Sequence, residues 1–222
     1  MGRFILHASL LDTCDCSMNM TVLLLILAAL SSSPLFKEGN KDDINNYRLI
    51  SILTSFSKIF EKTLQTRLLK HLTDHNILVK EQYGFRTKIK TDNTTYHLIN
   101  EILNALSNSL LIGGIFCDLE KAFDYVNHKI LLTKIEFYGI TGSHYKLDRY
   151  QRTLLYNEDG NITVSTWSKV EHGVPQGSVL GHLLFHIFIN DLPKFINDKS
   201  LPILLADDTS ILESHPNPMD FL

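Results

Sequence analysis

The chain has 222 residues, of which 44% are hydrophobic and 20% are charged, and its formal net charge is −3. This length supports one large domain or two lobes with a sizeable core, and the composition is that of an ordinary soluble protein. Three cysteines, two of them separated by a single residue, argue against a disulfide scaffold. They favour a reducing intracellular compartment, cytoplasmic or nuclear, over secretion.

The first segment, residues 1–33, is left unassigned. It contains an apolar run at residues 20–30, MTVLLLILAAL, which is too short to span a membrane comfortably. A buried helix is the preferred interpretation of this run, and the core of a signal peptide is the alternative. A polar, turn-rich break follows at residues 37–46, and we place the start of the main domain near it.

Charge is distributed unevenly along the chain. Residues 37–90 carry 11 basic and 6 acidic side chains, whereas the rest of the chain is acidic. A basic front half and an acidic back half would suit a polyanion held near a metal site. From charge alone, a solvated helical face rich in lysine explains the pattern equally well.

The next segments change from a helical to a strand-like pattern. Apolar residues recur at helical spacing between residues 52 and 76, with Thr54 or Ser55 as the expected cap. A second helix is predicted at residues 94–106. The continuous apolar run at residues 110–118 then predicts a buried strand that ends at Asp118.

The second half of the chain mixes predicted helices and strands without strict alternation. In chain order we predict a helix at 127–140 capped by Asn127 with Gly139 just past its end, a helix at 143–156, a β-rich stretch at 161–170, a turn at 173–178, a helix at 178–192 and a strand, tight turn and strand at 202–212. This mixture predicts an α+β fold.

Three acidic residues are candidates for a metal site. Asp207 and Asp208 are adjacent in a predicted hairpin turn, and Asp118 ends another apolar strand. The pair could be no more than turn residues, because Asp is common in turns. Their apolar flanks argue otherwise, since a semi-buried pair of carboxylates needs a cation or a proton. If the two strands are neighbours, three carboxylates converge, and such hard oxygen ligands suit Mg²⁺ or Mn²⁺.

Five motifs, in order and spacing, resemble the reverse transcriptases of non-LTR retrotransposons of the long interspersed element type. They are PLFKEGNKDDINNYRLISILTSFSKIFEKTLQTRLLKHL, EQYGFR, FCDLEKAFDYVNHKILLTKIEFYGI, GVPQGSVLGHLLFHIFINDLP and LLADDTSIL. The resemblance runs from about Pro34 to Leu212. It implies a right-hand polymerase with fingers (residues 34–109) and a palm (residues 110–222), in which an antiparallel palm sheet packs on helices. The thumb would be absent and the chain a truncated copy.

The same resemblance implies roles for individual residues. Asp118, Asp207 and Asp208 match the catalytic acids that hold two Mg²⁺ or Mn²⁺ ions. Phe123 matches the bulky aromatic residue beneath the incoming sugar, which excludes a 2′-hydroxyl; a core phenylalanine is the alternative.

The remaining residues of this set match nucleotide-binding positions. Gln176 and Gly177 match the nucleotide-positioning turn, and Arg86 matches a fingers arginine near the triphosphate. Arg48 matches a second fingers arginine, with a surface salt bridge as the alternative.

The implied function is that of an RNA-directed DNA polymerase. It would add deoxynucleotides to a primer 3′ end by two-metal phosphoryl transfer, with an RNA or DNA template, a primer and deoxynucleoside triphosphates as partners and no membrane. The alternative is an inactive retroelement remnant that folds and at most binds nucleic acid.

Overall fold

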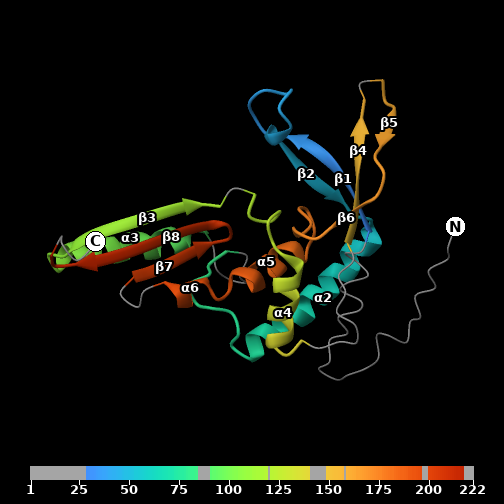
Figure 1. Cartoon of the computed structure of the whole chain (residues 1–222). Helices are drawn as coiled ribbons and strands as arrows, with labels where there is room; N and C mark the ends of the chain where they lie inside the picture. Colours follow the sequence, from blue (N-terminus) through green and yellow to red (C-terminus); the bar gives the residue numbers. More distant parts are fainter. Residues whose placement is uncertain are drawn as a thin grey trace.

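The computed structural model describes residues 29–84, 91–119, 121–140, 149–157, 159–196 and 200–217. Two β-sheets lie on either side of a central group of helices (Figure 1). In the described part of the chain, no helix combines the length and apolarity needed to cross a membrane. The mixture of helices and sheets agrees with the predicted α+β class.

A five-stranded sheet of mixed direction lies at one end of the molecule (Figure 1). Its strands are β1 (Ala29–Phe36), β2 (Tyr47–Ile52), β4 (Arg149–Tyr156), β5 (Ile162–Val164) and β6 (Ser168–Val170). β1 pairs antiparallel with β2 and parallel with β4, while β4 pairs antiparallel with β5 and β6. A short helix, η2 (Ile44–Asn46), precedes β2, so the polar break at residues 37–46 connects two paired strands.

A three-stranded antiparallel sheet lies at the other end. Its strand order is β3 (Leu111–Asp118), β8 (Asp208–His215) and β7 (Ser200–Leu205). β7 and β8 form the predicted hairpin, and β8 pairs along its whole length with β3. Helix α3 (Thr91–Ser107) lies behind this sheet in Figure 1, and it contacts β3 and β7.

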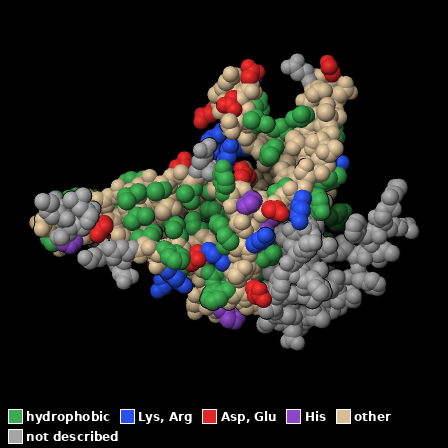
Figure 2. Space-filling model, in the orientation of Figure 1, with side chains coloured by type: hydrophobic (Ala, Val, Ile, Leu, Met, Phe, Trp, Pro, Cys, Tyr) green, Lys and Arg blue, Asp and Glu red, His purple; other side chains and the backbone are tan. Residues whose placement is uncertain are grey.

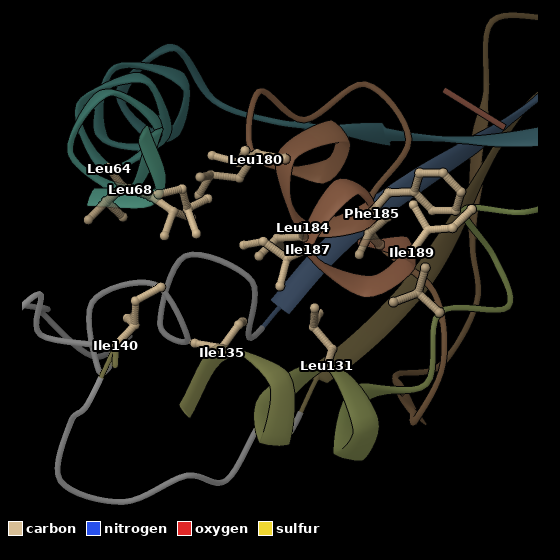
Figure 3. Packing of buried hydrophobic residues seen from close by; sticks show 14 residues of the cluster. Leu64, Leu68, Leu131, Ile135, Ile140, Leu180, Leu184, Phe185, Ile187 and Ile189 are labelled. Atoms are coloured by element: carbon tan, nitrogen blue, oxygen red, sulfur yellow. The ribbon is translucent and has the colours of Figure 1, made fainter. Parts of the chain in front are cut away.

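The hydrophobic core lies among three helices between the sheets. They are α2 (Ser55–Asp74), α4 (His128–Phe137) and α5 (Gly181–Ile189), and a short α6 (Leu192–Phe195) follows α5. Leu68 and Leu72 of α2, Ile135 of α4 and Leu184 and Ile187 of α5 are all at most 2% exposed. Figure 3 shows leucine and isoleucine side chains of the three helices directed toward one another. Truncating a buried leucine of this kind to alanine costs about 2–5 kcal/mol.

Local signals in the sequence set the helix ends as predicted. The Thr54 hydroxyl accepts a hydrogen bond from the Ser57 amide and caps α2, and the Asn127 side chain caps α4 by accepting from Lys129 and Ile130. Gly139 follows α4 with φ +79°, a left-handed conformation that glycine adopts without steric penalty.

Two sequence predictions are wrong. Residues 149–156, expected to continue a helix from 143, form the strand β4, because β1, β5 and β6 all supply hydrogen-bonding partners to it; residues 143–148 lie outside the described residues. The strand at 110–118 exists, but it is not buried. β3 is an edge strand on which Ile115 and Phe116 are 63% and 65% exposed. Figure 2 shows hydrophobic side chains spread over this part of the surface.

The helix expected at residues 20–30 lies mostly outside the described residues. Its last two residues, Ala29 and Leu30, begin the strand β1. The expected boundary at residue 34 therefore falls within β1.

The buried side chain of Glu61 links α2 to the segment that begins α5 by a hydrogen bond. Its side chain is fully buried, and its Oε2 accepts a hydrogen bond from the Val179 amide at 2.7 Å. The Leu180 side chain does not cap α5; Ser178 Oγ accepts from the Gly181 amide at 2.8 Å, and the Glu61 carboxylate adds an acceptor for the Val179 amide just before the helix. Burial raises the pKa of Glu61, and the backbone amides of Val179 and Leu180 oppose this only in part.

Replacing Glu61 with glutamine is expected to stabilise the fold at pH 7. A carboxyl whose pKa is raised by folding contributes stability that is complete below its ordinary value of 4.5 and is lost as the pH rises through the folded pKa. Glutamine has no charge to desolvate, and its oxygen can still accept from Val179. In urea unfolding, Glu61→Gln should unfold later than the wild type at pH 7, and the difference should close at pH 4. The exposed Glu136→Gln on α4 is the control, and a Glu61→Gln protein less stable than the wild type at pH 7 would contradict the expectation.

Candidate active site

Two of the three candidate acids lie opposite each other on adjacent strands of the three-stranded sheet. Asp118 is the last residue of β3 and Asp208 the first of β8, and the antiparallel register pairs them directly. Asp207 precedes Asp208 in the tight turn that joins β7 to β8. The strands that carry the acids are therefore neighbours, which is the condition under which the three carboxylates were expected to converge.

The three carboxylates lie close enough to repel one another. The pKa of Asp208 is raised by partial burial first, then by the charges of Asp207 and Asp118. Carboxylates that lie opposite each other at the ends of two paired strands create a negative potential, which a bound cation would reduce. Carboxylate oxygens are also the ligands that Mg²⁺ and Mn²⁺ prefer, so the donor set fits such an ion.

The geometry is not that of a preformed metal cage. Within the described residues, no group of three His, Cys, Asp or Glu side chains is placed to hold a metal ion.

The turn at residues 173–177 is fastened to the segment that follows Asp118. The Val174 amide donates to the Phe123 carbonyl at 2.7 Å, and the Gly173 amide donates to the Val126 carbonyl at 2.8 Å. The Gln176 side chain donates to the Asp124 carboxylate at 3.0 Å. Gly173 and Gly177 have φ values of +87° and +89°, which favour glycine. Gln176 and Gly177 are thus held in a fixed relation to the β3 strand end.

A buried arginine that no sequence motif marks supports this turn. The Arg149 side chain is 4% exposed and donates through Nη1 to the Gly173 carbonyl at 2.6 Å. The same oxygen accepts from His128 Nε2 at 2.7 Å. Burial lowers the pKa of Arg149 to about 10, with the Asp124 charge opposing the effect, so the guanidinium stays charged at neutral pH. Burial also lowers the pKa of His128, which favours the neutral ring that donates through Nε2.

A polar cavity of about 590 Å³ opens beside this turn. Its lining includes Ser51 from β2, Arg149 and Gln151 from β4, and Asp124 and Gln176 from the turn region. The Ser51 amide also donates to the Gln176 carbonyl at 2.9 Å, which links the five-stranded sheet to the turn. The cavity therefore lies where the five-stranded sheet meets the segment after Asp118.

Phe123 is half-buried and packs against the hydrophobic core. Its ring contacts Phe185 and His182, with centroid separations of 4.7 and 5.5 Å. Burial lowers the pKa of His182, and the charge of Asp207 opposes that change, which places His182 within electrostatic reach of the acids. Phe123 is thus a core-packing residue that also contacts His182, a side chain within electrostatic reach of Asp207.

Of the two candidate arginines, the structure describes only Arg48. Arg48 is exposed on β2, and within the part of the chain that the structure describes it forms no ion pair, so the surface salt bridge weighed for it is not seen. Arg86 lies outside the described residues.

Comparison with known proteins gives consistent matches. Residues 37–220 match the family described as reverse transcriptase (RNA-dependent DNA polymerase). The chain is 34% identical over 181 residues to the probable RNA-directed DNA polymerase from transposon BS of Drosophila melanogaster, and 32% identical over 182 residues to the RNA-directed DNA polymerase from mobile element jockey of the same species. These alignments cover 76% and 77% of this chain and 19% of each relative, so the chain spans about a fifth of their length.

Solved structures show a similar fold. A telomerase from Candida tropicalis, truncated from its C-terminal domain, superposes with a TM-score of 0.57 at 18% identity. The match covers 88% of this chain and 45% of that one. The telomerase of Candida albicans in complex with a fragment of telomeric RNA gives a TM-score of 0.55 at 11% identity over 88% of this chain and 39% of that one.

Proposed function

The chain belongs to the reverse transcriptase (RNA-dependent DNA polymerase) family, and from this premise we propose that it adds deoxynucleotides to a primer 3′ end by two-metal phosphoryl transfer. The observation that carries the proposal is the pairing of Asp118 with Asp208 across the sheet, with Asp207 beside them in the turn. Residues 34–109 would serve as fingers and residues 110–222 as the palm. The compartment would be the cytoplasm or the nucleus.

Asp118, Asp207 and Asp208 would hold two Mg²⁺ or Mn²⁺ ions. Bound there, such ions would lower the pKa of the primer hydroxyl and neutralise the triphosphate. The chain supplies the negative charge that attracts them, and the β3–β8 register fixes where that charge lies. The second partner would be an RNA or DNA template with a paired primer, and the family description, reverse transcriptase (RNA-dependent DNA polymerase), supports RNA as the template.

The turn residues would position the incoming nucleotide. Gln176 can donate and accept hydrogen bonds through its amide, and its bond to Asp124 sets the direction of the side chain. Gly177 lets the backbone approach a ligand closely. Arg86 and Arg48 would contact the triphosphate, for which a planar guanidinium is well suited.

Replacing Phe123 with valine is expected to admit ribonucleotides. A smaller side chain leaves room for a 2′-hydroxyl, so the preference for dTTP over UTP should fall by about 10-fold or more. Valine is chosen because alanine would remove more of the packing against Phe185 and the core. Single-nucleotide incorporation with each triphosphate measures the ratio of kcat/KM values. Phe188→Val on α5, which also packs against the core, is the control; an unchanged ratio in Phe123→Val would contradict the assigned role.

Primer extension on a poly(rA)–oligo(dT) duplex with Mg²⁺ or Mn²⁺ tests the proposed function. The wild type should extend the primer, and Asp207→Asn, folded by circular dichroism, should not. Absence of extension by a folded wild type would overturn the proposal and favour an inactive remnant.

A further inference from the structure

The turn that carries the acidic pair contains a strained residue. Ala206, directly before Asp207, has φ +59°, a left-handed conformation that residues other than glycine rarely adopt. Such a conformation persists only where surrounding contacts hold it, and it is concentrated at functional sites. The contacts that hold Ala206 therefore determine how Asp207 leaves the turn.

Those contacts come from one buried side chain far away in the sequence. Gln82 is 4% exposed, and its Oε1 accepts from the Ala206 amide at 3.1 Å. Its Nε2 lies 3.5 Å from the Ala206 carbonyl oxygen and donates to it. A single side-chain amide thus satisfies both backbone polar groups of the strained residue.

Gln82 is itself fixed by the backbone on either side of it. The Leu204 amide donates to the Glu81 carbonyl at 2.8 Å, and the Tyr83 amide donates to the Leu204 carbonyl at 2.7 Å. The Gly84 amide donates to Gln82 Oε1 at 2.8 Å. A β-carbon at Gly84 would lie 2.4 Å from the Ala206 nitrogen, so the two backbones are in close contact. Residues 81–84 therefore pair with the end of β7 and lie against the backbone of the turn.

We propose that Gln82 is a positioning residue for the acidic hairpin: by bonding both backbone groups of Ala206 it holds the left-handed turn that directs Asp207 and Asp208 toward Asp118. The catalytic consequence rests on the proposed function, whereas the structural consequence does not. Loss of the clamp would let Ala206 relax to an ordinary conformation, and Asp207 would change its direction relative to Asp208 and Asp118.

The test compares Gln82→Met, which keeps the side-chain volume, with Gln65→Met as a matched control on α2. Gln82→Met should raise the Mn²⁺ concentration needed for half-maximal primer extension by about 10-fold and leave the KM for dTTP within about twofold, because the acids and not the nucleotide turn are displaced. Adding Ala206→Gly to Gln82→Met should lower the required Mn²⁺ concentration again by at least about threefold, since glycine adopts the left-handed conformation unaided. Gln65→Met should change neither value.

Amide hydrogen exchange gives a readout that does not depend on activity. In the metal-free protein, Gln82→Met should speed exchange in the hairpin peptide spanning residues 203–209 by about 10-fold and leave α2 unchanged. If Gln82→Met does not fold, Gln82→Glu keeps the bonds from Ala206 and Gly84 and should give a smaller change in the same direction. Unchanged exchange in the hairpin would overturn the proposal, as would a loss of extension that Ala206→Gly does not relieve. A wild type without polymerase activity would refute only the proposed function.

Discussion

Replacing Asp118 with asparagine is expected to lower primer extension by about 1000-fold, and to leave the protein at least as stable as the wild type. Asparagine keeps the size of the side chain and removes one of the charges that would hold the cations. Burial raises the pKa of Asp208 most, followed by the charges of Asp207 and Asp118, and this change removes the last of these contributions. Activity and stability should therefore move in opposite directions, which is typical of a residue retained for function.

Extension assays and thermal unfolding of the metal-free protein measure the two effects. Asp74→Asn, a change of equal charge at the exposed end of α2, should alter neither by a large factor. An Asp118→Asn protein that extends primers at more than a tenth of the wild-type rate would exclude Asp118 from the catalytic set.

The second large effect is expected from Gly173→Ala, which should lower the free energy of unfolding by about 3 kcal/mol. Alanine would have to adopt φ +87°, and its β-carbon would lie 3.0 Å from the Asp124 carbonyl oxygen. The carbonyl of Gly173 also receives the bonds from Arg149 and His128. Displacement of this residue should therefore loosen the whole turn that presents Gln176, and extension should fall with stability.

Gly160→Ala separates the cost of the left-handed backbone from the cost of the close contact with Asp124. Gly160 has φ +76°, but nothing lies within 4 Å of a β-carbon placed there. The free energy of unfolding of Gly160→Ala should therefore fall by only about 1 kcal/mol, which is the cost of a left-handed backbone for alanine. Equal losses in chemical denaturation of the two variants would show that the contact with Asp124 does not constrain the turn.

The sequence predicted the features that depend on neighbours along the chain. Thr54 and Asn127 cap helices because their side chains reach amides two or three residues away. Asp207 lies in a turn, with Asp208 as the first residue of the next strand, because apolar strands flank the pair. The family motifs assigned Asp118 and this hairpin to one metal site, although no local pattern showed that their strands pair.

Features that depend on distant partners were missed. β4 forms because three other strands pair with it, and the exposure of β3 follows from its place at a sheet edge. Arg149 carried no signal in the sequence, since its acceptor, the Gly173 carbonyl, is 24 residues away. Gln82 stood within the EQYGFR motif, but its role depends on the φ angle of Ala206, which one sequence cannot reveal.

The most direct test of a shared cation site is a Mn²⁺ titration followed by electron paramagnetic resonance, with dTTP present, on the wild type, Asp118→Asn and Asp207→Asn. The carboxylates paired across β3 and β8 predict about two bound ions in the wild type and weakened binding in both variants, by about 10-fold or more. Equal Mn²⁺ binding by all three proteins would show that these acids do not form a metal site.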